Sequence, residues 1–77
     1  MKELLEVLAK SLVDRVESVY VNEIKGEQTT ILELKVAAED MGKVIGKQGR
    51  IAKAIRTIMK AAAMHKGQRI NIEIIQA

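Results

Sequence analysis

The spacing of hydrophobic and polar positions divides the chain into short, regular elements. Residues 1–16 carry apolar side chains three and four positions apart, which predicts an amphipathic helix. Residues 18–37 are rich in β-branched side chains and are interrupted by a glycine-containing turn at 25–28, which predicts two strands. The apolar stripe of the predicted first helix consists of Leu4, Leu5, Leu8, Leu12, Val13 and Val16.

The second half of the chain predicts two helices and a last strand. A short helix is expected from Glu39 to about Ile45, and a longer one from Arg50 to about His65. Residues 69–75 alternate as a strand. Because the helix pair forms a crossover, the second and third strands are expected to run parallel. The predicted fold is α+β, in the order α-β-β-α-α-β, with a three-stranded mixed sheet and helices on one face.

Alternation within the predicted strands indicates which side chains face the helices. In the second strand, one set of alternate residues is apolar and the other is mostly polar. The first strand alternates less cleanly, with Tyr20 expected on the opposite face. The residues expected to face inward are Val19, Val21, Leu32, Leu34, Val36, Ile70, Ile72 and Ile74.

Length and composition limit the chemistry. A chain of 77 residues is expected to form one domain, residues 1–77, with a thin core. With no cysteine and one histidine, neither a metal site nor a cofactor is expected, and no catalytic arrangement surrounds His65. The protein is therefore expected not to be an enzyme. No apolar run is long enough for a signal peptide or membrane span, so we expect a cytoplasmic protein without membrane association.

The charged residues are strongly segregated along the chain. Residues 1–40 have a net charge of −4, whereas residues 41–69 hold eight Lys and Arg and no Asp or Glu. On a helical wheel of residues 50–65, an apolar stripe of Ile51, Ala52, Ile55, Ile58, Met59 and Ala62 lies apart from the cations. The separate cationic stripe consists of Arg50, Lys53, Arg56 and Lys60. This separation favours a polyanion as ligand.

A glycine-containing loop, Gly46-Lys47-Gln48-Gly49, lies between the two helices of this basic block. Glycines allow close approach of a ligand backbone, and a helix start with nearby cations favours phosphate. The spacing does not match a P-loop, which needs four residues between its glycines and a Ser or Thr where Gln48 stands. A dinucleotide-binding fingerprint is also excluded, because Val44 occupies the position of a required glycine.

The segment from Val44 to Ile55, VIGKQGRIAKAI, resembles the G-x-x-G motif region of the KH domain. The predicted order of elements is similar to the type II, bacterial arrangement of that fold, and the resemblance covers the whole chain. It implies a clamp on the backbone of about four nucleotides of single-stranded RNA or single-stranded DNA. The shortage of aromatic residues then excludes only those single-strand binders that stack bases on rings.

The resemblance also implies a role for each site residue. Gly46, Lys47, Gln48 and Gly49 would contact the nucleic-acid backbone, with Arg50 behind them. Ile45 would line an apolar groove beside the bases, whereas Val44 is assigned to the core. The expected peripheral phosphate contacts are Lys43, Lys53 and Arg56, with Lys66 and Arg69 at the turn before the last strand.

By the same resemblance, the protein would act as an RNA chaperone and post-transcriptional regulator linked to cell shape and the cell wall. It would form a homodimer and pair with a larger RNA-binding protein that carries its own KH domain. Two other functions remain open at this point: a helix-turn-helix DNA binder, and a protein-interaction module whose basic face is incidental. Exposed apolar candidates for such a module are Ile31, Met64 and Ile75.

Overall fold

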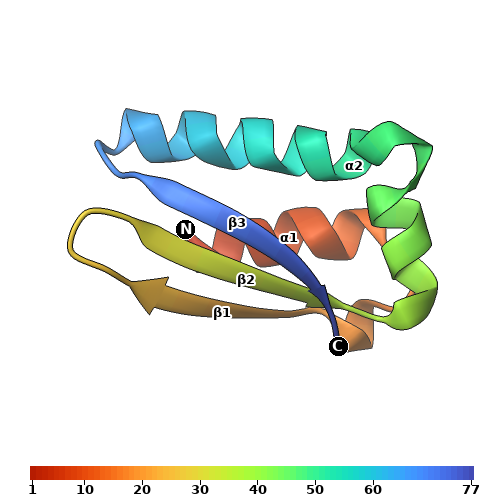
Figure 1. Ribbon diagram of the computed structural model, residues 1–77. Helices are drawn as coiled ribbons and strands as arrows, with labels where there is room; N and C mark the ends of the chain where they lie inside the picture. The colour runs from red at the N-terminus through yellow and green to blue at the C-terminus, as the bar shows by residue number, and fades with distance from the viewer.

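The computed structural model describes residues 1–77 apart from the side chain of Lys47. Its elements follow the predicted order, with one short 3₁₀ helix added before the first strand (Figure 1). The elements are α1 (Lys2–Leu12), η1 (Val16–Ser18), β1 (Tyr20–Lys25), β2 (Thr30–Val36), α2 (Ala38–His65) and β3 (Ile70–Gln76). The two helices expected between β2 and β3 form one element, α2, which bends sharply between two helical arms (Figure 1).

The three strands form a mixed sheet in the order β1-β2-β3. β1 and β2 are antiparallel and are joined by a tight turn, whereas β2 and β3 are parallel. The register places Val21 opposite Leu34, and Leu34 opposite Ile74. The predicted mixed sheet is confirmed, and the long helical connection explains the parallel pair, since parallel strands require a crossover.

The core lies between one face of this sheet and the helices. Inward-facing residues of all three strands meet residues of α1 and of both arms of α2. The opposite face of the sheet is not covered by a helix (Figure 1), and there Tyr20 is 54 % exposed, with Lys35 Nζ 5.7 Å from its ring centroid. The largest fully buried apolar side chains are Leu5, Val21, Leu32, Leu34, Val36, Val44, Ile55 and Met59.

The first helix is shorter than its apolar pattern suggests. Leu5 and Ala9 form the centre of its buried face, but Leu4 and Leu12 are partly exposed. The chain leaves the helix at Val13, which has extended backbone, so Val16 belongs to η1 and is not part of the α1 face. Of the predicted stripe, Leu5 and Val13 lie in the core and Leu8 packs against it, whereas Leu4, Leu12 and Val16 are exposed; the buried Ala9 was not predicted.

A buried carboxylate joins the start of α2 to the segment after α1. Asp40 is 1 % exposed, and its two oxygens accept hydrogen bonds from the backbone N–H groups of Asp14 (3.1 Å) and Arg15 (3.0 Å). Burial opposes ionisation, but these two donors, together with the charges of Lys43 and Arg15, hold the pKa of Asp40 below its ordinary value. The first arm of α2 is thus fixed in position against α1.

The end of α2 is closed by a glycine. Gly67 has a φ of 68°, and its N–H bonds to the Met64 carbonyl (3.0 Å), while the N–H of Gln68 bonds to the Ala63 carbonyl (2.8 Å). This pair of bonds is the Schellman motif, which needs a left-handed residue at this position. It turns the chain directly into β3.

Candidate nucleic-acid interface

The bend in α2 is produced by two consecutive residues with left-handed backbone. Gln48 has a φ of 64° and Gly49 a φ of 69°, whereas Gly46 keeps a negative φ. A right-handed helix cannot continue through such residues, so the second arm departs in a new direction (Figure 1). Of the four residues predicted to form a loop, only the last two leave the right-handed helical conformation.

The inside of the bend is an open cavity of about 250 Å³ lined by Gly42, Lys43, Gly46, Arg50 and Ile51. A Cβ added to Gly42 or Gly46 would meet no atom within 4 Å, so neither glycine is required by packing inside the protein. The absence of side chains at these two positions leaves backbone accessible from outside. A ligand backbone can therefore approach this surface closely.

Two neighbouring residues next to the bend face opposite ways. Val44 is 1 % exposed and belongs to the core, whereas Ile45 is 49 % exposed. Ile45 is not among the residues that line the cavity, but it is next to Gly46 in the chain, and its exposure leaves an apolar side chain accessible near the bend. The assignment of Val44 to the core is confirmed, whereas the contact role of Ile45 stays a prediction.

The second arm carries the expected separation of apolar and cationic residues. In the predicted stripe, Ala52, Ile55 and Met59 are buried and Ile58 is half exposed. Ile51 and Ala62 are partly buried, and the buried Ala63 was not predicted. Arg50, Lys53 and Lys60 are exposed and Arg56 is partly exposed. Among the described side chains, none of these four cations is ion-paired with a carboxylate. Their positive charge is therefore available to an external anion.

Lys43 differs from the other predicted contacts. Its Nζ donates a 2.7 Å hydrogen bond to Oδ2 of Asp14, and this bond raises the pKa of Lys43 above its ordinary value. Both side chains are substantially exposed, so the pair is weak and can be replaced by another anion. Sequence reasoning found Lys43 but not Asp14, because the two lie 29 residues apart.

The structure does not bring every predicted residue to the bend. Lys66 and Arg69 are exposed at the turn between α2 and β3, at the opposite end of the second arm (Figure 1). The predicted set therefore divides into residues at the bend, to which Lys43 also belongs, a separate pair near the start of β3, and Arg56 further along the second arm. The other residues at the bend are Ile45, Gly46, Gln48, Gly49, Arg50 and Lys53.

Sequence reasoning missed Asp40, which sets the position of the first arm. An acidic residue in the first turn of a helix is a recognisable signal, but it usually indicates capping of the same helix. Here the carboxylate accepts hydrogen bonds from residues 25 and 26 positions earlier in the chain. Only the fold reveals that pairing.

A mixed sheet, a long crossover and a G-x-x-G bend between two helical arms together form the architecture of a KH domain. A model of the KhpA/KhpB KH domain matches residues 2–74. The chain therefore belongs to the KhpA/KhpB family of KH domains.

Similar proteins occur in distant bacteria. Proteins named RNA-binding protein KhpA from Clostridium perfringens and Clostridium acetobutylicum are 67% and 68% identical to it, each over 97% of this chain and all of the relative. A protein of the same name from Aquifex aeolicus is 49% identical over 99% of this chain and 96% of the relative. No solved structure matches significantly. Across the residues that the structure describes, no helix has the length and apolar character needed to cross a membrane.

Proposed function

We propose that this chain binds single-stranded RNA, with single-stranded DNA as a second ligand, by clamping the nucleic-acid backbone at the α2 bend. The observation that carries the proposal is the bend itself, where accessible glycine backbone and Arg50 line one cavity. The exposed Ile45 is next to Gly46 in the chain, and the exposed Lys53 is three residues after Arg50. Glycines admit the phosphate backbone, cations neutralise it, and an aliphatic side chain contacts a base. The RNA-binding name of the relatives supports the same ligand.

The biological role that we propose follows from this binding mode. The chain acts as a single KH domain over residues 1–77 and is not an enzyme. It serves in the cytoplasm as an RNA chaperone and post-transcriptional regulator, with effects on cell shape and the cell wall. Its partners are a second copy of itself and a larger KH-containing RNA-binding protein, and the shared KhpA/KhpB family supports such pairing.

A double substitution at the bend tests the clamp. Lys47→Asp with Gln48→Asp places two negative charges beside the expected phosphates, so the affinity for a fluorescent RNA tetranucleotide should fall by at least about tenfold. Fluorescence anisotropy measures the affinity, and circular dichroism checks the fold.

A matched control is available at the other end of the molecule. Lys25→Asp with Gln28→Asp makes the same two changes at the exposed end of β1 and in the turn that follows it. This variant should bind the tetranucleotide nearly as well as the wild type. Equal loss in both variants, or no loss in a folded bend variant, would refute the clamp.

Competition with duplex DNA separates the clamp from a helix-turn-helix DNA binder. A recognition helix reads the major groove of a duplex, whereas a clamp at a G-x-x-G bend takes an unpaired strand. Unlabelled single strands should therefore displace the tetranucleotide, and a duplex of the same sequence should displace it poorly. Stronger competition by the duplex would favour the helix-turn-helix alternative.

A further inference from the structure

One cation at the bend is held by a carboxylate from another part of the chain. Lys43 lines the cavity of about 250 Å³ inside the bend, and its Nζ donates a 2.7 Å hydrogen bond to Oδ2 of Asp14. Asp14 lies between α1 and η1 and is not among the residues that line this cavity. A residue of the proposed binding surface thus has its charged end bound to a group outside that surface.

The backbone of Asp14 is fixed beside Lys43 by the buried Asp40. The two oxygens of Asp40 accept hydrogen bonds from the N–H groups of Asp14 and Arg15, at 3.1 and 3.0 Å. Asp40 and Lys43 are three positions apart in the first arm of α2, so their side chains are neighbours on its surface. The fold therefore places the Asp14 carboxylate within reach of Lys43, although only the backbone of Asp14 takes part in the anchoring bonds.

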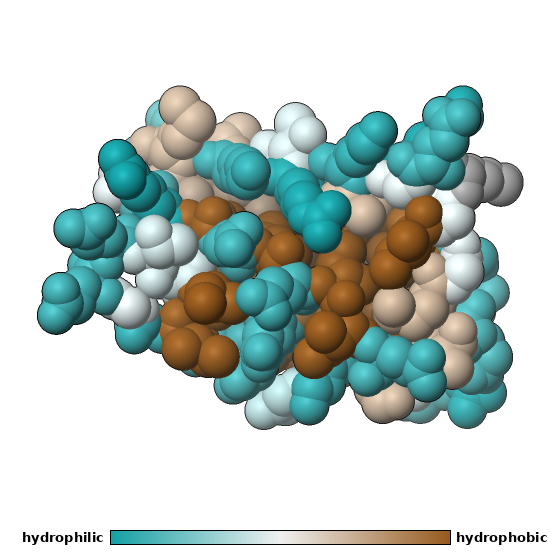
Figure 2. All heavy atoms as spheres, in the orientation of Figure 1, coloured by the Kyte–Doolittle hydropathy of each residue, from teal (hydrophilic) through white to brown (hydrophobic). Residues whose placement is uncertain are grey.

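The contact between Asp14 and Lys43 is exposed to water. The Asp14 side chain is 79 % exposed and the Lys43 side chain 43 %. Figure 2 shows hydrophilic side chains on the side of the molecule where the first arm of α2 lies. Exposed ion pairs contribute little to stability, because water and salt screen them. An incoming anion can therefore take the place of the carboxylate without disturbing the fold.

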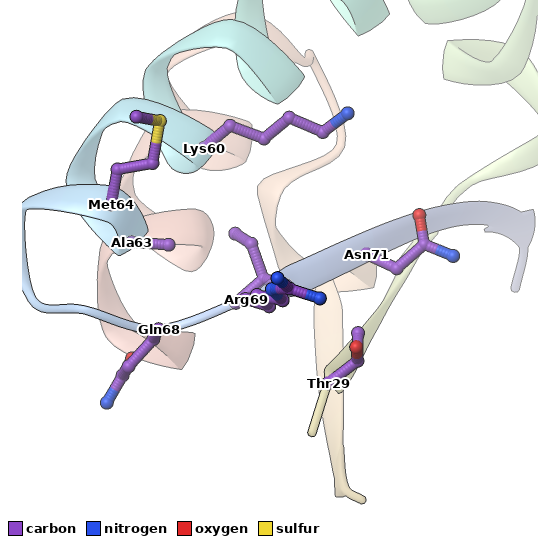
Figure 3. A pocket seen from close by; sticks show the side chains of 8 residues that line it. Thr29, Lys60, Ala63, Met64, Gln68, Arg69 and Asn71 are labelled. Carbon is purple, nitrogen blue, oxygen red and sulfur yellow. The ribbon is translucent and has the colours of Figure 1, made fainter.

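The other cations that line cavities of the molecule have no such partner. Arg50 lines the same cavity as Lys43, and among the described side chains it makes no ion pair. A second cavity, of about 350 Å³, lies between the far end of the second arm of α2 and the start of β3. Figure 3 shows Lys60 on the α2 side of that opening and Arg69 on the β3 side, and no described carboxylate is paired with either. The carboxylate partner thus distinguishes Lys43.

We propose that Asp14 competes with RNA for Lys43: its carboxylate holds the ammonium group in the free protein and releases it to a phosphate when a strand enters the bend. This inference rests on the proposed function, since the displacing anion is a phosphate of the strand that the bend holds. Carboxylate and phosphate oxygens accept the same charge-assisted hydrogen bond from an ammonium group. A carboxylate that stayed on Lys43 would repel the arriving phosphate, so the two must exchange. Asp14 thus lowers the affinity without contacting the strand.

Replacing Asp14 by asparagine tests this competition. The variant keeps the backbone N–H that bonds to Asp40 but has no negative charge, so Lys43 is released before the strand arrives. The affinity for the fluorescent RNA tetranucleotide, measured by anisotropy, should rise by about two- to fivefold, as expected for the loss of an exposed ion pair. Because the Asp14 side chain is exposed, the melting temperature followed by circular dichroism should stay nearly unchanged.

A double-mutant cycle shows whether Asp14 acts through Lys43. In a Lys43→Gln background, the same Asp14→Asn change should alter the affinity by less than about 1.5-fold, because the lysine for which Asp14 competes is gone. A gain of equal size in both backgrounds would mean that Asp14 repels the strand directly, and would overturn the competition. No gain in the folded Asp14→Asn protein would overturn it as well.

Glu17→Gln is the matched control. It removes one negative charge from the neighbouring exposed pair of Arg15 and Glu17, and neither residue lines either cavity. Its affinity for the tetranucleotide should stay within about 1.5-fold of the wild type, and a gain equal to that of Asp14→Asn would assign the effect to net charge and overturn the competition.

The wild-type protein separates this inference from the proposed function. Binding that is lost in the variant with Lys47→Asp and Gln48→Asp, but does not respond to Asp14→Asn, would leave the clamp intact and overturn the competition alone. If the wild-type protein did not bind the tetranucleotide, the proposed function itself would fail, and this inference with it.

Discussion

Asp40 shows how a single side chain can position a binding surface without touching the ligand. Its carboxylate accepts two backbone hydrogen bonds from the segment after α1, and it lies in the first arm of α2, six residues before Gly46. A buried carboxylate is stable only when donors replace its lost water, and here two N–H groups do so. The bend is therefore anchored to the rest of the molecule on its N-terminal side.

Replacing Asp40 by asparagine should lower the melting temperature by about 5–10 °C near neutral pH. The amide oxygen can accept one of the two hydrogen bonds, but the amide nitrogen cannot accept the other. Thermal unfolding followed by circular dichroism measures the effect. RNA binding at low temperature should be weakened only modestly, because the side chain does not contact the ligand.

The stabilisation from Asp40 should also depend on pH. Its pKa is lowered in the folded protein, so the stabilisation is complete above the ordinary value of 3.8 and is lost as the pH falls through the lower folded-state pKa. The difference in melting temperature between wild type and Asp40→Asn should hold from neutral pH down to about pH 5 and shrink below about pH 4. A difference that stayed constant into strong acid would contradict this assignment.

At the scale of elements, α2 contains two motif glycines with different roles, one in stability and one in function. Gly49 needs its left-handed backbone for the bend, whereas Gly46 has a negative φ, and a methyl group in place of its hydrogen would meet no atom within 4 Å. The two glycines of the motif are therefore not equivalent. Gly49 is required by the fold, whereas the fold does not require a glycine at Gly46, which leaves space beside the helix.

Substituting each glycine by alanine should separate these roles. Gly49→Ala should cost about 1 kcal/mol, because an alanine in left-handed backbone is strained. Gly46→Ala should be neutral or stabilise by up to about 1 kcal/mol, because alanine favours helix, yet it should weaken RNA binding by obstructing the strand. Chemical denaturation and anisotropy measure the two effects. A Gly46→Ala variant with unchanged affinity would show that the strand does not approach this backbone.

The sequence predicted the elements well where periodicity was strong. The alternating strands and the core stripe around Ile55 and Met59 were identified because local spacing determines which side chains share a face. It failed to find the pairings of Asp14 with Lys43 and of Asp40 with the backbone after α1. Those features depend on partners more than 20 residues away, which no local pattern records.

At the scale of the whole molecule, charge is segregated between the two halves of the chain. The first 40 residues have a net charge of −4, and the acid-free block at 41–69 supplies α2 after its first turn and the turn before β3. The sequence alone revealed this basic block. It did not reveal that residues of the block line two separate cavities at opposite ends of the second arm of α2. That division depends on where β3 passes the helix.

The segregation predicts strongly salt-dependent binding. With three or four phosphates neutralised at the bend, log K for a tetranucleotide should fall against log salt with a slope of about −2 to −3. Anisotropy titrations across a series of potassium chloride concentrations give this slope. A flat response would mean that the cations do not contact phosphate, and would favour a protein-interaction module with an incidental basic face.

The most direct measurement is an NMR titration of the ¹⁵N-labelled wild-type protein with an RNA tetranucleotide. The account predicts that the largest changes in amide chemical shift occur at residues 45–53, around the α2 bend. Amides of α1 and of the uncovered face of the sheet should change little. Changes concentrated on α1 or on that face of the sheet, or no changes at saturating RNA, would contradict the account.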